Sequence, residues 1–106
     1  MSGAQKFDGE KTRLDLFPPE ALEAIGQVLT FGAKKYAAHN WRKGLDWSRL
    51  HAAALRHLNA WASGQDADPE SGLSHLAHAG CCISMLIANE KSAMGVDDRW
   101  KNAVVP

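Results

Sequence analysis

The sequence predicts an all-α domain, a small antiparallel helical bundle. Apolar residues recur every three or four positions in three segments, and no segment alternates apolar and polar residues over a strand's length. With 45% hydrophobic and 23% charged residues among 106, the composition is typical of a globular protein. We therefore expect one domain over 1–106, with an extended arm at 1–17, a helical core at about 18–90 and a tail at 91–106.

The first helix is expected to begin at Pro18 and Pro19. Residues 1–17 mix charges with few large apolar side chains and show no clear period, which indicates an arm. The two prolines supply the φ angle of a helix start, and Glu20 and Glu23 suit the positive end of a helix dipole. Apolar positions at helical spacing continue this helix to about 36–39.

A second and a third helix are expected on either side of an acidic loop. Either Asp46 or Ser48 is expected to cap the second helix, which runs to Gly64. The loop at 65–72 follows, and helical spacing resumes over 73–90, where Gly80 would allow close contact between helices. In the tail, Trp100 is expected to dock the segment on the bundle.

Charge and hydropathy exclude some partners. A formal net charge of zero offers no broad basic surface, so nucleic acid is not expected as a partner. The longest apolar run, 79–88, is much shorter than the roughly 20 residues of a membrane span, and the N-terminus lacks the apolar stretch of a signal peptide. We expect a cytoplasmic protein with no membrane partner, whose adjacent Cys81 and Cys82 are buried reduced thiols.

The segment 53–78 gathers three of the five histidines and several acids around one helix–loop–helix connection. His75 and His78 share a helical stripe with Cys82, and imidazoles together with carboxylates are suitable metal ligands. The competing interpretation is that these histidines bond carbonyls or acids inside the bundle. The metal ligands that we expect are Asp68, Glu70, His75 and His78.

Cationic and aromatic residues near this segment are candidates for binding a nucleotide. Arg56 places a permanent cation beside His57, which is expected to act as metal ligand or as base. Each of the others has a plainer interpretation: a solvated charge, a cation that offsets a helix dipole, or a buried indole. The substrate-binding candidates are Lys11, Arg13, Lys34, Lys35, Asn40, Trp41 and Arg56.

Several sequence blocks, in order, resemble the phage dATP/dGTP diphosphohydrolases, which are similar to the MazG-like all-α nucleotide pyrophosphohydrolases. The resemblance runs from about Lys6 to Leu86. The blocks are Lys-Phe-Asp-x-x-Lys-x-Arg-Leu-Asp-Leu-Phe-Pro-Pro-Glu, Phe-Gly-Ala-Lys-Lys-Tyr, Asn-Trp-Arg-Lys-Gly, Ala-x-x-Arg-His-Leu-x-Ala-Trp and Asp-Pro-Glu-Ser-Gly-Leu-x-His-Leu-Ala-His.

The resemblance implies a homo-oligomeric enzyme, dimer or tetramer, of phage nucleotide metabolism in the host-cell cytoplasm. It would hydrolyse a purine deoxynucleoside triphosphate, dGTP or dATP, to monophosphate and pyrophosphate with a divalent metal, generally Mg²⁺. In some phages the resulting dGMP feeds synthesis of a 2-aminoadenine genome. MazG-like chains carry Glu-x-x-Glu and Glu-x-x-Asp, whereas this chain has Ala54-x-x-His57 and His75-x-x-His78. Histidines favour Mn²⁺, Co²⁺ or Zn²⁺ as alternatives to Mg²⁺.

The hypothesis from the sequence is therefore metal-dependent hydrolysis at the α-phosphorus, with His57 and Glu70 as catalytic residues. The alternative is a non-catalytic helical phage module that binds a structural metal or a protein partner through its histidine cluster. A phosphohydrolase of the histidine-aspartate type ranks last, because the chain contains no His-Asp dipeptide.

Overall fold

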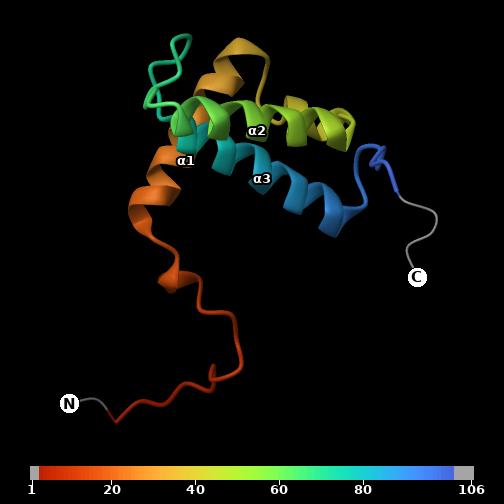
Figure 1. Ribbon diagram of the computed structural model, residues 1–106. Helices are drawn as coiled ribbons and strands as arrows, with labels where there is room; N and C mark the ends of the chain where they lie inside the picture. The colour runs from red at the N-terminus through yellow and green to blue at the C-terminus, as the bar shows by residue number, and fades with distance from the viewer. Residues whose placement is uncertain (1–2, 102–106) are drawn as a thin grey trace.

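The computed structural model describes residues 3–101 and is all-helical over that range, which confirms the predicted fold class (Figure 1). No strand forms within those residues; two isolated bridges pair Asp46 with Val96 and Ala67 with Ser74. The elements are η1 (Leu14–Leu16), α1 (Pro19–Lys35), η2 (Asn40–Lys43), α2 (Trp47–Ala62) and α3 (His75–Ser92).

Helix α1 begins at Pro19, as the two prolines predict, and ends at Lys35. The N–H of Tyr36 closes the last turn by donating to the carbonyl of Gly32 at 2.9 Å. The segment before the helix leads away from the other helices as an arm (Figure 1) and contains only the 3₁₀ turn η1.

Helix α3 is the central helix, because both α1 and α2 pack against it (Figure 1). Helices α2 and α3 form a hairpin joined by the loop 63–74. The hydroxyl of Ser74 caps α3 by accepting the N–H of Leu76 at 3.1 Å. The hairpin brings the C-terminal half of α2 beside the start of α3, and His57, His75 and His78 lie there.

Small side chains let α1 and α3 approach closely. Val28, Ala77 and Cys81 form a buried cluster between the two helices. A Cβ atom at Gly80 would lie 2.9 Å from Cδ1 of Ile25, which is closer than van der Waals contact allows. The expectation that Gly80 permits close helix contact is confirmed.

The C-terminal segment is attached to α2 by different residues from the one expected. The indole N–H of Trp47 donates to the carbonyl of Met94 at 2.8 Å, and Asp98 accepts the backbone N–H of Ser48 at 2.8 Å. Trp100 is 86% exposed, so its predicted docking role is wrong. Asp46 does occupy the N-cap position, but its side chain makes no capping hydrogen bond, because Asp98 supplies the carboxylate instead.

No helix within residues 3–101 is long and apolar enough to cross a membrane.

Candidate functional site

A groove of about 1100 Å³ opens between α1, the connection 36–46 and α2, with part of α3 as its floor. Its walls combine apolar side chains with a set of cations, which suits a ligand that is partly aromatic and partly anionic. The charged and polar residues along it include Lys35, Asn40, Arg42, Arg49, Arg56, His57, Asp68, Glu70 and His78.

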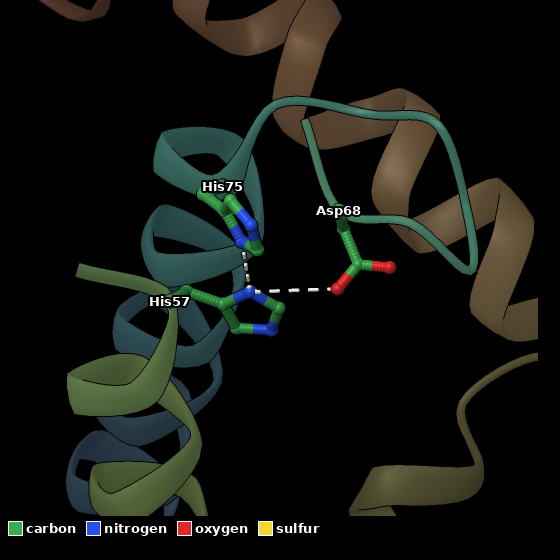
Figure 2. Close-up of side chains that lie close together, drawn as sticks. All are labelled: His57, Asp68 and His75. Atoms are coloured by element: carbon green, nitrogen blue, oxygen red, sulfur yellow. Dashed lines mark hydrogen bonds and ion pairs between the residues drawn. The ribbon is translucent and has the colours of Figure 1, made fainter. Parts of the chain in front are cut away.

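At one end of this groove, His57, Asp68 and His75 converge from α2, the loop and α3 (Figure 2). One donor atom from each residue lies within 4.8 Å of the other two. The Nδ1 atoms of His57 and His75 are 2.9 Å apart, and the Nδ1 of His57 is 3.9 Å from Oδ2 of Asp68. The second distance is too long for a hydrogen bond, so the carboxylate faces the imidazole without contacting it directly.

The direction of Asp68 is set by its own loop. Its Oδ1 atom accepts the backbone N–H groups of Glu70 at 2.8 Å and Ser71 at 3.1 Å, an Asx turn. The other oxygen, Oδ2, is thereby directed toward His57 (Figure 2). The carboxylate is largely enclosed, with 19% of the side chain exposed.

The histidine rings are held by neighbouring polar side chains. Nε2 of His75 lies 2.7 Å from Oε1 of Gln65, and Nε2 of His78 lies 2.7 Å from the hydroxyl of Ser71. The rings of His57 and His78 stack, with centroids 4.5 Å apart and planes 11° from parallel. His75 is 4% exposed, whereas His78 lines the groove.

The surroundings favour the neutral forms of His57 and His78 and the ionised form of Asp68. Burial, together with the nearby His78, lowers the pKa of His57, and burial also lowers the pKa of His78. Burial raises the pKa of Asp68, but the N–H groups of Ser71 and Glu70 outweigh it and leave that pKa below its usual value. Neutral imidazoles and an ionised carboxylate are the forms that bind metal ions.

Glu70 lies beside the cluster without joining it. Its carboxylate accepts a hydrogen bond from Nζ of Lys35 at 2.7 Å, and this hydrogen bond raises the pKa of the lysine. Both residues line the groove, and both are exposed. The predicted roles of Glu70 as metal ligand and catalytic residue stay predictions.

The structure also sorts the other predicted site residues. Lys35, Asn40, Trp41 and Arg56 line the groove with His57, Asp68 and His78, while His75 belongs to the cluster but is buried and does not line the groove. Lys34 is exposed and does not line the groove. Lys11 and Arg13 lie in the arm, where the Arg13 guanidinium pairs with Asp15 at 2.7 Å.

Four residues at the site were not singled out by the sequence. Arg42 and Arg49 add two cations to the groove, and the Arg42 guanidinium lies 4.3 Å from the ring centroid of Trp41. Gln65 and Ser71 hold histidines from the loop. The adjacency of Arg42 to Trp41 was a usable signal, whereas nothing in the sequence distinguishes Gln65 from any other polar loop residue.

The fold and the site together define the class of protein: an all-α domain in which a cation-lined groove leads to a histidine–aspartate cluster. The family model described as dATP/dGTP diphosphohydrolase, N-terminal, matches residues 1–99, and the chain belongs to this family. A protein of Salmonella phage PMBT28, named dATP/dGTP diphosphohydrolase, is 37% identical over 101 residues. The match covers 95% of this chain and 34% of that protein, so the chain spans about a third of the length of the curated relative. No solved structure matches the chain significantly.

Proposed function

We propose that this chain carries the active site of a nucleotide diphosphohydrolase, which uses a divalent metal to cleave dGTP or dATP into the monophosphate and pyrophosphate. The observation that carries the proposal is the continuity of the groove, which joins four cations and an indole to the histidine–aspartate cluster. Membership of the family and the name of the phage relative support the same substrate class.

The cluster offers a donor set that fits a divalent ion. His57, Asp68 and His75 supply two imidazoles and one carboxylate within 4.8 Å of one another, and three protein ligands are the usual number at a catalytic zinc site. A bound ion would neutralise phosphate charge and lower the pKa of a water molecule.

The chain's own residues would bind and orient the nucleotide. Lys35, Arg42, Arg49 and Arg56 line the groove, and cations in such a position neutralise a triphosphate and hold it in place. The Arg42 guanidinium lies over the ring of Trp41, and both residues line the groove, which supports a role for the indole in contacting a planar base. We assign base recognition to this indole.

The proton-accepting group would be His78 or Glu70. His78 lines the groove with a lowered pKa, so it is neutral near pH 7 and able to take a proton from water. Its hydrogen bond to Ser71 fixes the ring plane. His57, at the centre of the cluster, is better placed as a ligand than as a base.

We also propose that the chain folds as one domain, forms a homo-oligomer and acts in the cytoplasm. Its proposed context is phage nucleotide metabolism, where the dGMP produced would supply synthesis of 2-aminoadenine. The exposed apolar side chains on α2 and α3 support the oligomer. The phage origin of the relative supports the context.

The test is a product assay with purified protein and a panel of ribo- and deoxynucleoside triphosphates. Reactions with Mg²⁺, Mn²⁺ or Co²⁺ are resolved by ion-exchange chromatography, with a chelator control. Monophosphate and pyrophosphate from dGTP or dATP are expected, and they should disappear with chelator. Intact triphosphates, combined with a metal-dependent rise in Tm, would instead support the non-catalytic module with a structural metal.

Variants assign the residues. His57→Ala is expected to lower kcat/KM by at least about 100-fold, as loss of a metal ligand or general base does. His51→Ala is the matched control, since His51 is an exposed histidine on the same helix and outside the groove. Full activity in Glu70→Gln would remove Glu70 from the catalytic residues.

A further inference from the structure

Gln65 holds a position that the proposed hydrolysis does not use. Its side chain leaves the α2–α3 loop and bonds the buried ring of His75 at Nε2, 2.7 Å away. Two backbone hydrogen bonds fix this position: the N–H of Gln65 donates to the carbonyl of Ala60, and the N–H of His75 donates to the carbonyl of Asp66. The loop therefore holds the Gln65 carboxamide against the ring.

This contact bears on which nitrogen of His75 carries the proton. The atom of Gln65 that faces the ring is Oε1, a carbonyl oxygen, which only accepts hydrogen bonds. If that oxygen accepts a hydrogen bond from the ring, the neutral form of His75 carries its hydrogen on Nε2, and Nδ1 keeps its lone pair. The Nδ1 atom of His75 lies 2.9 Å from Nδ1 of His57, inside the cluster (Figure 2).

Asp68 and His57, the other two members of the cluster, also direct a possible ligand atom into it. Oδ1 of Asp68 accepts two backbone N–H groups, so Oδ2 is the oxygen that faces His57. With the hydrogen of His75 on Nε2, the hydrogen bond between the two Nδ1 atoms, 2.9 Å apart, would be donated by His57. Moving that hydrogen to Nε2 of His57 would leave two nitrogen lone pairs and one carboxylate oxygen around the same point.

We propose that Gln65 is a positioning residue that fixes the tautomer of His75 and makes His57, Asp68 and His75 a three-point site for Mn²⁺, Co²⁺ or Zn²⁺ in preference to Mg²⁺. Two imidazole nitrogens and one carboxylate suit these ions, whereas Mg²⁺ prefers oxygen ligands and retains water. A histidine ligand whose other ring nitrogen donates to a carbonyl is the usual arrangement at such sites. The inference rests on the proposed function only for the presence of a divalent ion.

The experiment measures metal affinity rather than turnover. Co²⁺ is titrated into the purified protein and followed by its visible absorption, with excess Mg²⁺ as competitor. Gln65→Leu, which keeps the size but loses the acceptor, is expected to weaken Co²⁺ binding by about 10–100-fold. Gln65→Glu, which restores an acceptor oxygen, is expected to bind Co²⁺ at least as tightly as the unchanged protein.

Gln27→Leu is the matched control, because Gln27 is an exposed glutamine on α1 outside the cluster, and its Co²⁺ affinity should not change. Long-range ¹⁵N spectra give the second readout. In the metal-free protein, the proton of His75 is expected on Nε2 and that of His57 on Nδ1, and saturation with Zn²⁺ should move the latter to Nε2.

Three results would overturn the inference: no Co²⁺ binding by the unchanged protein, displacement of Co²⁺ by Mg²⁺, or unaltered affinity in Gln65→Leu. The proposed function fails separately. If Co²⁺ binds and depends on Gln65 but no triphosphate is cleaved, the metal site stands and the hydrolase does not. If a triphosphate is cleaved but the affinity for Co²⁺ does not depend on Gln65, the proposed hydrolase stands and the inference about Gln65 fails.

Discussion

At the scale of single residues, the site depends on polar side chains that each satisfy two demands. Asp68 accepts two backbone N–H groups with one oxygen and faces His57 with the other. Ser71 accepts the N–H of Leu73 and also bonds His78. Structural and functional roles of these residues can be separated only by substitutions that remove one atom's function and retain the other's.

Asp68→Asn is such a substitution. The amide oxygen of asparagine can still accept both loop N–H groups, so the free energy of unfolding should change by less than about 1 kcal/mol. The charge facing His57 is lost, so affinity for Co²⁺ should fall by at least about tenfold. Urea denaturation and Co²⁺ titration measure the two effects separately.

Asp68→Ala removes both functions and should destabilise the metal-free protein by about 1–3 kcal/mol, because two loop N–H groups lose their acceptor. The control is Asp66→Asn, since Asp66 lies in the same loop, is exposed, and is outside the cluster. Equal Co²⁺ affinities for Asp68→Asn and Asp66→Asn would contradict the ligand role of Asp68.

The lowered pKa values of His57 and His78 predict a pH dependence of stability in the metal-free protein. The unfolded histidines take up protons as the pH falls through the ordinary value of 6.5, while the folded ones resist protonation because they are partly buried. The unfolded state then binds more protons, so the free energy of unfolding should decrease below about pH 6.5 and be insensitive to these groups above it.

Urea denaturation between about pH 5 and pH 8, on either side of the ordinary histidine pKa, would measure this slope. The double variant His57→Gln, His78→Gln should lose most of it, whereas His51→Gln, on the exposed part of α2, should keep it. A slope retained in full by the double variant would show that other groups cause the pH dependence. Asp68 contributes in a separate, lower window, where its stabilisation is lost as the pH falls below its ordinary value of 3.8.

At the scale of elements, much of the fold could be predicted because its signals are local. Pro19 begins α1, and helical spacing on both sides of an acidic loop predicted the α2–α3 hairpin. The same local signal placed His57 and His75 near each other, since their helices are consecutive and are joined by one loop. The partner of Glu70 could not be predicted, because Lys35 lies 35 positions away and the direction of a loop side chain follows no period.

The tail shows the same limit. Docking by Trp100 was a reasonable expectation for an isolated tryptophan, but the contact is made by Trp47 and Asp98, across 47 and 50 positions of sequence. Gly95 allows the approach: its φ is 73°, and a Cβ there would lie 2.5 Å from the carbonyl of Leu45. Long-range contacts of this kind leave no periodic trace in the sequence.

Packing of α1 on α3 predicts a graded response at Gly80. A Cβ there would lie 2.9 Å from Cδ1 of Ile25, the mobile end of a side chain, so Gly80→Ala should be near neutral in stability. Gly80→Val adds bulk that the interface cannot absorb and should cost about 1–3 kcal/mol. Thermal and urea denaturation would measure the difference.

Ile25→Val removes the clashing Cδ1 atom, so the cost of Gly80→Val should be smaller in that background. Gly26→Ala is the control within α1: no atom lies within 4 Å of its Cβ position, and replacing a helical glycine should stabilise the protein by about 0.5–1 kcal/mol. A cost of Gly80→Val that is the same with Ile25 and Val at that position would contradict the contact.

At the scale of the whole molecule, the chain is more open than a compact domain of its length. Its radius of gyration is 17.4 Å, against about 13 Å for a compact domain of 100 residues. The arm accounts for part of the difference (Figure 1), and the groove between α1 and α2 leaves those helices covered on one side. Large apolar side chains also remain exposed on the outer surfaces of α2 and α3, including Leu55, Leu58, Trp61, Leu76, Ile83 and Ile87.

Leu76, Ile83 and Ile87 share one stripe of α3, because they are separated by seven and four positions. Water exposure of such a stripe is unfavourable by about 25 cal/mol per Å², which favours burial against another surface. We expect the chain to associate with itself through this stripe, and the double variant Ile83→Lys, Ile87→Lys to be monomeric. Sedimentation velocity at several concentrations would measure the masses of the species in solution.

Ser84→Lys is the control, because it adds charge beside the stripe on an exposed residue and should leave association unchanged. A monomeric unchanged protein, or a double variant that still associates, would contradict this assignment of the interface.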